Sequence, residues 1–212
     1  MKFSFVCPSP TPRTKGTIEA PWPPLGVLYC AGVLNDDGVE VSVLDQAAKG
    51  ASSDQVLKWI RKEDPDILGF SVLITSYRES LEFARRAKEI NPNLLTVFGN
   101  YHATFNAERI LKKDPSVDVI VRGEAEQAVL GLADYVKKKR SLEEIAGITF
   151  RNQKNRIIST PDAPLMDDIE ALPIPDRDLT DLPRQRRRAL FKHCLCVHPC
   201  KDRTRCINAR TR

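Results

Sequence analysis

The feature that most constrains the fold is a regular alternation of strand-like and helix-like segments through the first 140 residues. Five short apolar runs have the composition of strands, at residues 2–6, 39–44, 65–73, 93–99 and 117–121. Five amphipathic segments follow them in turn, at residues 23–38, 52–63, 76–90, 106–114 and 124–139. Because strands and helices alternate one by one, we predict an α/β domain over residues 1–140.

The strand-like runs are apolar on both sides, as "DILGF" and "VDVIV" illustrate. Such strands are typical of a parallel sheet with helices on both faces. We therefore predict a doubly wound, five-stranded parallel sheet of the flavodoxin-like or Rossmann-like kind. Its ligand site would lie in the crevice beyond the carboxyl ends of the strands.

Composition and charge exclude several kinds of partner. The chain is 42% hydrophobic and 29% charged, which is ordinary for a soluble domain. No apolar stretch approaches the roughly 20 residues that span a bilayer, and prolines soon interrupt the opening "MKFSFVCPSP". Residues 184–212 carry a net charge of +9, which leaves −4 for the rest of the chain. We expect a cytoplasmic protein that binds neither membrane nor nucleic acid.

The loops after the predicted strands do not fit a dinucleotide. The first strand is followed by "CPSPTP" in place of a Gly-x-Gly-x-x-Gly turn, and the chain has no phosphate-binding Walker sequence. Glycines in the loops at 45–50 and 99–105 would instead let a larger ligand approach the backbone.

Three loop segments together indicate a known family. In order, "DQAAKG" (45–50), "SVL" (71–73) and "GN" (99–100) resemble the Asp-x-His-x-x-Gly, Ser-x-Leu and Gly-Gly signature of cobalamin-binding domains. Wider stretches, including "GNYHATF" and "VDVIVRGEAE", resemble the N-terminal domain of cobalamin-dependent radical S-adenosylmethionine proteins. The likeness extends to about residue 183 and implies cobalamin as the cofactor.

The resemblance has one departure of chemical importance. Ala47 stands where the histidine of the methionine synthase branch ligates cobalt, and alanine has no donor atom. The resemblance therefore implies a corrin bound without a histidine ligand. Asp45 would orient that histidine, and here it would instead bond backbone or a corrin amide, or form a local turn.

The same resemblance assigns the other contacts. Ser71 would offer its hydroxyl to the nucleotide tail beside Leu73, and Gly99 would leave room for that tail. Asn100 replaces the second glycine of the family pair. We expect the cofactor-binding residues to be Asp45, Ala47, Gly50, Ser71, Leu73, Gly99, Asn100, His102, Gly123 and Glu124. Local roles remain alternatives, in particular turn formation by the glycines and helix capping by Glu124.

The pattern changes after residue 140. Residues 141–160 are predicted to form a β-hairpin extension, and the proline-rich residues 161–183 a linker. Residues 184–212 are arginine-rich, and we expect a disordered tail. Their cysteines, Cys194, Cys196, Cys200 and Cys206, do not have the Cys-x3-Cys-x2-Cys spacing that holds a 4Fe-4S cluster in radical S-adenosylmethionine proteins.

These features predict the cobalamin module of a radical S-adenosylmethionine enzyme, of methyltransferase type, without its catalytic barrel. The iron–sulfur cluster and S-adenosylmethionine would then belong to a full-length parent or to a separate radical S-adenosylmethionine domain. No catalytic residue is assigned, and metal binding by the clustered cysteines stays open. One alternative is a cofactor-free, flavodoxin-like signalling or partner-binding domain, and a flavin-binding protein is a third candidate.

Overall fold

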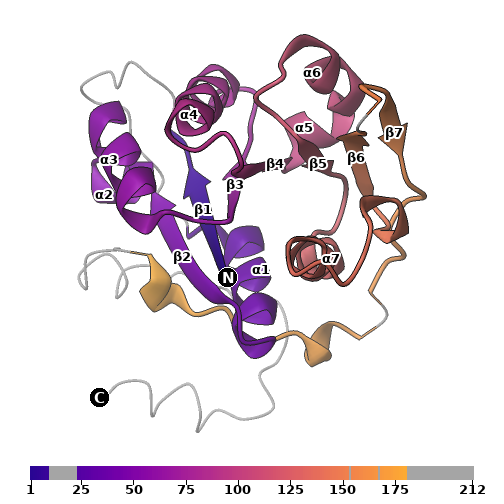
Figure 1. The fold of residues 1–212 in the computed structure, drawn as a ribbon. Coiled ribbons are helices and arrows are strands. Elements are labelled where there is room, and N and C mark those ends of the chain that lie inside the picture. The colour runs from indigo at the N-terminus through magenta and orange to yellow at the C-terminus, as the bar shows by residue number, and fades with distance from the viewer. Residues whose placement is uncertain (10–22, 153, 167, 181–212) are drawn as a thin grey trace, which may run out of the picture. The chain divides into compact units, whose positions relative to one another are not determined.

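The computed structural model describes residues 1–9, 23–152, 154–166 and 168–180 (Figure 1). The chain divides into two compact units, Met1–Leu182 and Pro183–Arg212, and all described residues belong to the first. The predicted disordered tail and its four cysteines lie outside the described residues.

Within the first unit, the predicted alternation of strands and helices is present. The strands are β1 (Lys2–Cys7), β2 (Glu40–Asp45), β3 (Ile67–Ser71), β4 (Leu95–Gly99), β5 (Val119–Val121), β6 (Ile148–Arg151) and β7 (Ile157–Ser159). The α-helices are α1 (Leu25–Asp36), α2 (Gln46–Lys49), α3 (Ser53–Glu63), α4 (Tyr77–Ile90), α5 (Tyr101–Phe105), α6 (Ala107–Lys113) and α7 (Glu126–Val136). Three short 3₁₀ turns are η1 (Leu142–Glu144), η2 (Ile169–Ala171) and η3 (Arg177–Leu179).

The sheet is mostly parallel and has the order β2-β1-β3-β4-β5-β6-β7. Strands β1 to β5 pair in parallel, which confirms the predicted α/β class. The predicted strand count of five is wrong, because the hairpin of β6 and β7 continues the same sheet. Strand β6 joins antiparallel to β5, with Val119 opposite Phe150, and β7 follows antiparallel to β6.

Helices cover both faces of the sheet (Figure 1). Helices α3, α4 and α6 bury Val56, Phe83 and Ile110 against Phe70 and Phe98 of the strands. On the opposite face, α1 and α7 pack on the other side chains of the strands; this layer includes Phe3, Cys30, Leu34, Ile67, Val97, Leu132 and Phe150. Fully burying one such side chain contributes about 1.5–3 kcal/mol, so the two layers account for a stable platform.

Local sequence explains where the principal helices begin and end. Ser52 accepts a hydrogen bond from the Gln55 backbone while the Gln55 side chain accepts from the Ser52 N–H, which forms a capping box at the start of α3. Helix α1 begins directly after two prolines, and the chain leaves it through Gly38 at φ +74°. That conformation disfavours any residue with a Cβ atom.

The proline-rich segment contacts helix α1 through Pro173. A Cβ atom at Gly32 of α1 would lie 2.8 Å from Pro173 Cγ, so the close approach requires glycine. Arg122, which follows β5, forms a 2.6 Å ion pair with Asp162.

Among the helices of the described residues, none combines the length and apolarity needed to cross a bilayer.

Candidate functional site

The carboxyl ends of β1 to β4 lie level with one another along one edge of the sheet. Cys7 pairs with Asp45, and Ser71 pairs with Gly99. Extending the register of β1 and β3 by one residue places Cys7 beside Ser71. In a sheet with the strand order 2-1-3-4-5, successive strands are added first on one side of β1 and then on the other. The ligand crevice opens at this switch point, between β1 and β3. Ser71 therefore lies at this crevice.

A hydrogen bond joins the ends of β3 and β4. Asn100 Nδ2 donates to Ser71 Oγ over 3.0 Å, and Asn100 Oδ1 accepts from the Tyr101 backbone N–H over 2.7 Å. The backbone adds a further link, since the Val72 N–H donates to the Gly99 carbonyl over 3.0 Å. The structure thus brings together Ser71, Gly99 and Asn100, three residues for which the resemblance implies contacts with the cofactor.

Asn100 has a backbone conformation that other residues avoid. Its φ of 76° and ψ of 174° lie in a region that is essentially restricted to glycine. Holding a residue with a Cβ atom there costs about 1–3 kcal/mol. This conformation gives a physical reason for the second glycine of the family signature and identifies Asn100 as a strained substitute.

Space remains open over Gly99. Within the described part of the chain, a Cβ atom added at Gly99 would meet no other atom within 4 Å, in contrast to Gly69 of β3, where it would lie 2.8 Å from the Phe5 ring. Side chains alternate along a strand, so Gly99 and Ser71 are on the same face as Val97 and Ile67, which pack in the α1 and α7 layer. The open space therefore adjoins the Ser71 hydroxyl.

The segment of residues 45–50 folds into a short helix. Asp45 caps α2 by accepting from the Ala48 N–H over 3.0 Å, and Gly50 ends it at φ 66°. Strand β1 separates β2 from β3, so Asp45 lies about 10 Å from Ser71 at the usual strand spacing. Ala47 is half-buried beside this edge, and the segment presents no nitrogen donor from a histidine.

His102 lies in α5, directly after β4. Its ring stacks at a tilt on Tyr77, with the ring centroids 4.6 Å apart. Burial, and then the charge of Arg109, lower the pKa of His102 below its ordinary value of 6.5. The contact directs His102 toward the start of α4.

Gly123 and Glu124 lie in the exposed loop after β5. Gly123 has φ 68°, and its N–H donates to Thr104 Oγ1 over 3.4 Å, which ties this loop to α5. Helix α7 begins at Glu126 with Ala125 as its cap and without a side-chain capping bond. Glu124 therefore lies two residues before α7 and makes no side-chain capping bond to it.

Two residues at this edge belong to loops that the sequence places after strands, but the sequence assigned them no contact with a ligand. Cys7 ends β1 at the crevice, where burial and the charge of Asp45 strongly raise its pKa, so it stays a neutral thiol. A neutral thiol is a poor metal ligand and nucleophile. Gln46 is buried and accepts from the Ser9 N–H over 2.8 Å, which fastens the end of β1 to α2. The strand order, which periodicity does not give, adds that β1 borders the crevice and lies beside β2.

Several large apolar side chains are exposed around the edge. Leu73 and Ile74 follow β3 and are 46% and 70% exposed, and Tyr101 and Phe105 of α5 are 74% and 81% exposed. A loose apolar rim of this kind is typical of a surface that a ligand or another domain covers.

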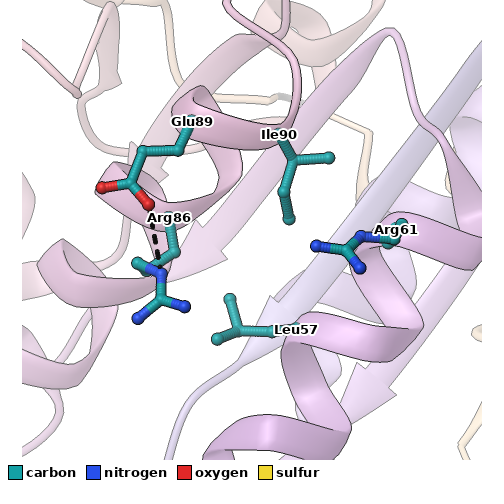
Figure 2. Close-up of a pocket in the computed structure, with 5 residues that line it drawn as sticks. All are labelled: Leu57, Arg61, Arg86, Glu89 and Ile90. Atoms are coloured by element: carbon teal, nitrogen blue, oxygen red, sulfur yellow. Dashed lines mark ion pairs between the residues drawn. The ribbon is translucent and has the colours of Figure 1, made fainter.

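Among the described residues, a surface pocket lies apart from this edge, and no cluster of metal-ligating side chains is present. A surface pocket of about 290 Å³ lies between α3 and α4, lined by Leu57, Arg61, Arg86, Glu89 and Ile90 (Figure 2). Arg86 and Glu89 pair across 3.2 Å in the last turns of α4, so the pocket is nearer the amino edge of the sheet. In residues 1–9, 23–152, 154–166 and 168–180, no three His, Cys, Asp or Glu side chains are grouped to hold a metal ion.

Comparison with known proteins agrees with this geometry. The chain is 31% identical over 189 residues to the uncharacterized methyltransferase PH0819 of Pyrococcus horikoshii, covering 89% of this chain and 40% of that protein. It is 33% identical over 159 residues to an anaerobic magnesium-protoporphyrin IX monomethyl ester cyclase of Rubrivivax gelatinosus, covering 73% and 29%. The chain therefore spans well under half the length of these relatives.

Solved structures share the fold. The cobalamin-dependent S-adenosylmethionine radical enzyme OxsB with aqua-cobalamin and S-adenosylmethionine bound matches 84% of this chain and 24% of its own, with a TM-score of 0.70 and 22% identity. The methyltransferase TsrM of Kitasatospora setae with cobalamin and a [4Fe-4S] cluster bound matches 82% and 31%, with a TM-score of 0.63 and 16% identity. A model of the B12 binding domain matches residues 14–133. These findings confirm the predicted resemblance, and the chain belongs to the B12 binding domain family.

Proposed function

We propose that this chain is the cobalamin-binding module of a cobalamin-dependent radical S-adenosylmethionine enzyme of methyl-transfer type. The observation that carries the proposal is the open space over Gly99 beside the Ser71 hydroxyl, at the ligand crevice of a B12-family sheet. The nucleotide tail of the cofactor would enter this space, and the corrin would lie over the carboxyl ends of the strands.

The residues at the crevice fit such a ligand. Gly99 leaves room for an inserted group, and Ser71 offers a hydroxyl beside it. Gly123, with open space of its own, and exposed Glu124 border the same edge from the β5 side. When bound, cobalamin supplies a cobalt ion that can carry a methyl group and pass it on. The chain's own part is to bind and orient the corrin and to shield its tail from water.

The segment of residues 45–50 supports a corrin held without a nitrogen ligand from the protein. Ala47 has no donor atom, and the Asp45 carboxylate caps α2. His102, the one histidine of the described residues, packs its ring on Tyr77. The cobalt face toward the protein would therefore meet apolar atoms and backbone.

The exposed apolar rim supports a partner above the cofactor. Leu73, Ile74, Tyr101 and Phe105 together would be covered by the periphery of the corrin and by a radical S-adenosylmethionine domain, carried by a longer chain or a separate one. The relatives are two to four times as long as the segment they share with this chain. In this proposal, the 4Fe-4S cluster and S-adenosylmethionine belong to that domain.

A binding experiment tests the proposal. The purified chain is mixed with hydroxocobalamin, separated from free corrinoid by gel filtration, and its absorption spectrum is recorded. We expect a protein-bound corrin spectrum at close to one cobalamin per chain. Elution of the protein without corrinoid would contradict the proposal and favour a cofactor-free partner-binding domain.

A further inference from the structure

We propose that Arg122 couples the cofactor loop after β5 to the proline-rich segment that begins at Pro161, so that bound cobalamin holds this segment in place and the segment in turn tightens cobalamin binding. The inference rests on the proposed function, because it concerns regulation of the same site. It assigns Arg122 the role of a positioning residue, which acts on the cofactor through its neighbours Gly123 and Glu124.

The proline-rich segment leaves the sheet at the edge where the cofactor would bind. Strand β6 runs antiparallel to β5 and β7 antiparallel to β6, so β7 ends on the same side of the sheet as β5 (Figure 1). Val121 at the end of β5 pairs with Ile148, and the Thr160 N–H donates to the Ile148 carbonyl over 2.9 Å. Thr160 therefore lies level with the carboxyl end of β5, and Pro161 follows it.

The side chain of Arg122 holds the start of this segment. Its Nη1 pairs with Asp162 Oδ1 over 2.6 Å, and its Nη2 donates to the Thr160 carbonyl. The Arg122 side chain is 19% exposed, and its buried Nε has no hydrogen-bond partner among the described residues. Within that part of the chain, the guanidinium is therefore held by its two terminal nitrogens, and both of them bind the segment.

Backbone hydrogen bonds extend the link through Gly147. The Arg122 N–H donates to the Gly147 carbonyl over 2.7 Å, and the Gly147 N–H donates to the Pro161 carbonyl over 2.7 Å. A Cβ atom at Gly147 would lie 2.9 Å from the Ala163 Cβ, so this turn and the segment are in close contact. We call the contacts that join Arg122 and Gly147 to residues 160–163 the Arg122 clasp.

The clasp lies directly beside the cofactor loop. Gly123 follows Arg122, and its N–H reaches Thr104 Oγ1 of α5 over 3.4 Å, which is long for a hydrogen bond. The clasp therefore holds this loop more firmly than α5 does. A ligand that contacts Gly123 or Glu124 favours one position of the loop and thereby favours the closed clasp. Because coupling between two sites is reciprocal, the closed clasp favours the ligand by the same factor.

The test breaks the clasp at its exposed end. Asp162→Ala removes the ion pair and should leave the core intact, since the Asp162 side chain is 85% exposed. We expect this variant to bind hydroxocobalamin about two- to fivefold more weakly, the range for one exposed ion pair. Hydrogen exchange of the Gly147 N–H, followed by NMR, reports the clasp, because this N–H donates to Pro161. Saturating hydroxocobalamin should slow this exchange at least about twofold in the wild-type chain, and less in Asp162→Ala.

A second variant and a matched control separate coupling from general stability. Arg122→Lys keeps the charge but lacks the planar fork that binds Asp162 and Thr160 together, so it should weaken cobalamin binding at least as much. Adding Asp162→Ala to it should then cost less affinity than it does in the wild-type chain. The control, Asp37→Ala, removes the 3.1 Å ion pair with Lys137 and should change neither cobalamin affinity nor Gly147 exchange.

Each contrary result has its own meaning. Unchanged cobalamin affinity in Asp162→Ala, or exchange at Gly147 that cobalamin does not slow, would overturn the inference while cobalamin binding stands. An equal loss of affinity in Asp37→Ala would also overturn it, because the effect would then reflect a general loss of stability. Failure of the wild-type chain to bind hydroxocobalamin would overturn the proposed function and the inference with it.

Discussion

The side chain of Asn100 donates to Ser71 Oγ over 3.0 Å and thereby joins the ends of two neighbouring parallel strands. The bond lies beside Gly99, whose missing Cβ leaves the adjoining space open. The strained backbone of Asn100, its hydrogen bond to Ser71 and the open space over Gly99 therefore lie together at the sheet edge, and each can be tested separately.

Strain at Asn100 predicts an unusual order of stabilities. Asn100→Ala loses both amide hydrogen bonds but keeps the costly φ and ψ, whereas Asn100→Gly loses the bonds and relieves the strain. We expect the glycine variant to exceed the alanine variant by about 1–3 kcal/mol in free energy of unfolding. Urea denaturation of the two variants measures the difference. Equal stabilities would mean that the backbone at residue 100 is unstrained.

Open volume at Gly99 predicts that a larger side chain blocks the ligand and spares the fold. Gly99→Leu should abolish retention of cobalamin while the protein still unfolds cooperatively, since the new side chain occupies ligand space. Gly69→Ala is the matched control, because its Cβ would press on Phe5 in the core and lower stability. Gel filtration with hydroxocobalamin and thermal unfolding give the two readouts. Wild-type retention by Gly99→Leu would place the tail elsewhere.

The cap of α2 predicts a stability effect at Asp45. Replacing Asp45 by Ala removes the acceptor for the Ala48 N–H and should cost about 1 kcal/mol. Asp45→Ser keeps an oxygen at the cap and should restore most of that loss. The free energies of unfolding of the two variants, compared with that of the wild type, measure this effect. An alanine variant as stable as the wild type would show that the cap contributes nothing.

The lowered pKa of His102 predicts how stability depends on pH. The unfolded chain takes up the proton more readily than the folded one, so this contribution is complete above pH 6.5 and is lost as pH falls toward the lower folded pKa. The wild-type chain should therefore lose more stability between pH 7.5 and 5.5 than His102→Asn, as measured by urea unfolding at both values. A parallel decline in the two proteins would exclude His102 as the cause.

Much of the fold could be predicted from periodicity alone, because five buried strands and five longer helices carry strong local signals. The shorter helices α2 and α5 carried none, since four and five residues held by the caps of Asp45 and Asn100 leave no repeating pattern. The pairing of β6 with β5 was missed for another reason. It joins Val119 to Phe150 across a long stretch of chain, and local sequence does not encode such contacts.

The candidate site was predictable in part. The resemblance identified Ser71, Gly99 and Asn100, which the sheet register brings together. The sequence placed Cys7 and Asp45 at the carboxyl ends of strands, but it could not show that β2 is an edge strand or that β1 and β3 are neighbours, because both depend on the strand order. The strain at Asn100 was likewise invisible until its backbone angles were known.

The central claim is that cobalamin binds with no nitrogen ligand from the protein, and electron paramagnetic resonance of the cobalt(II) form tests it most directly. Ala47 has no donor atom and His102 packs on Tyr77, so we predict a spectrum without nitrogen superhyperfine splitting. Protein labelled with ¹⁵N distinguishes the sources, because a protein nitrogen would then split each line into two and a tail nitrogen into three. A doublet from labelled protein that disappears in His102→Ala would contradict the claim and identify His102 as the ligand. A triplet would contradict the insertion of the tail beside Gly99.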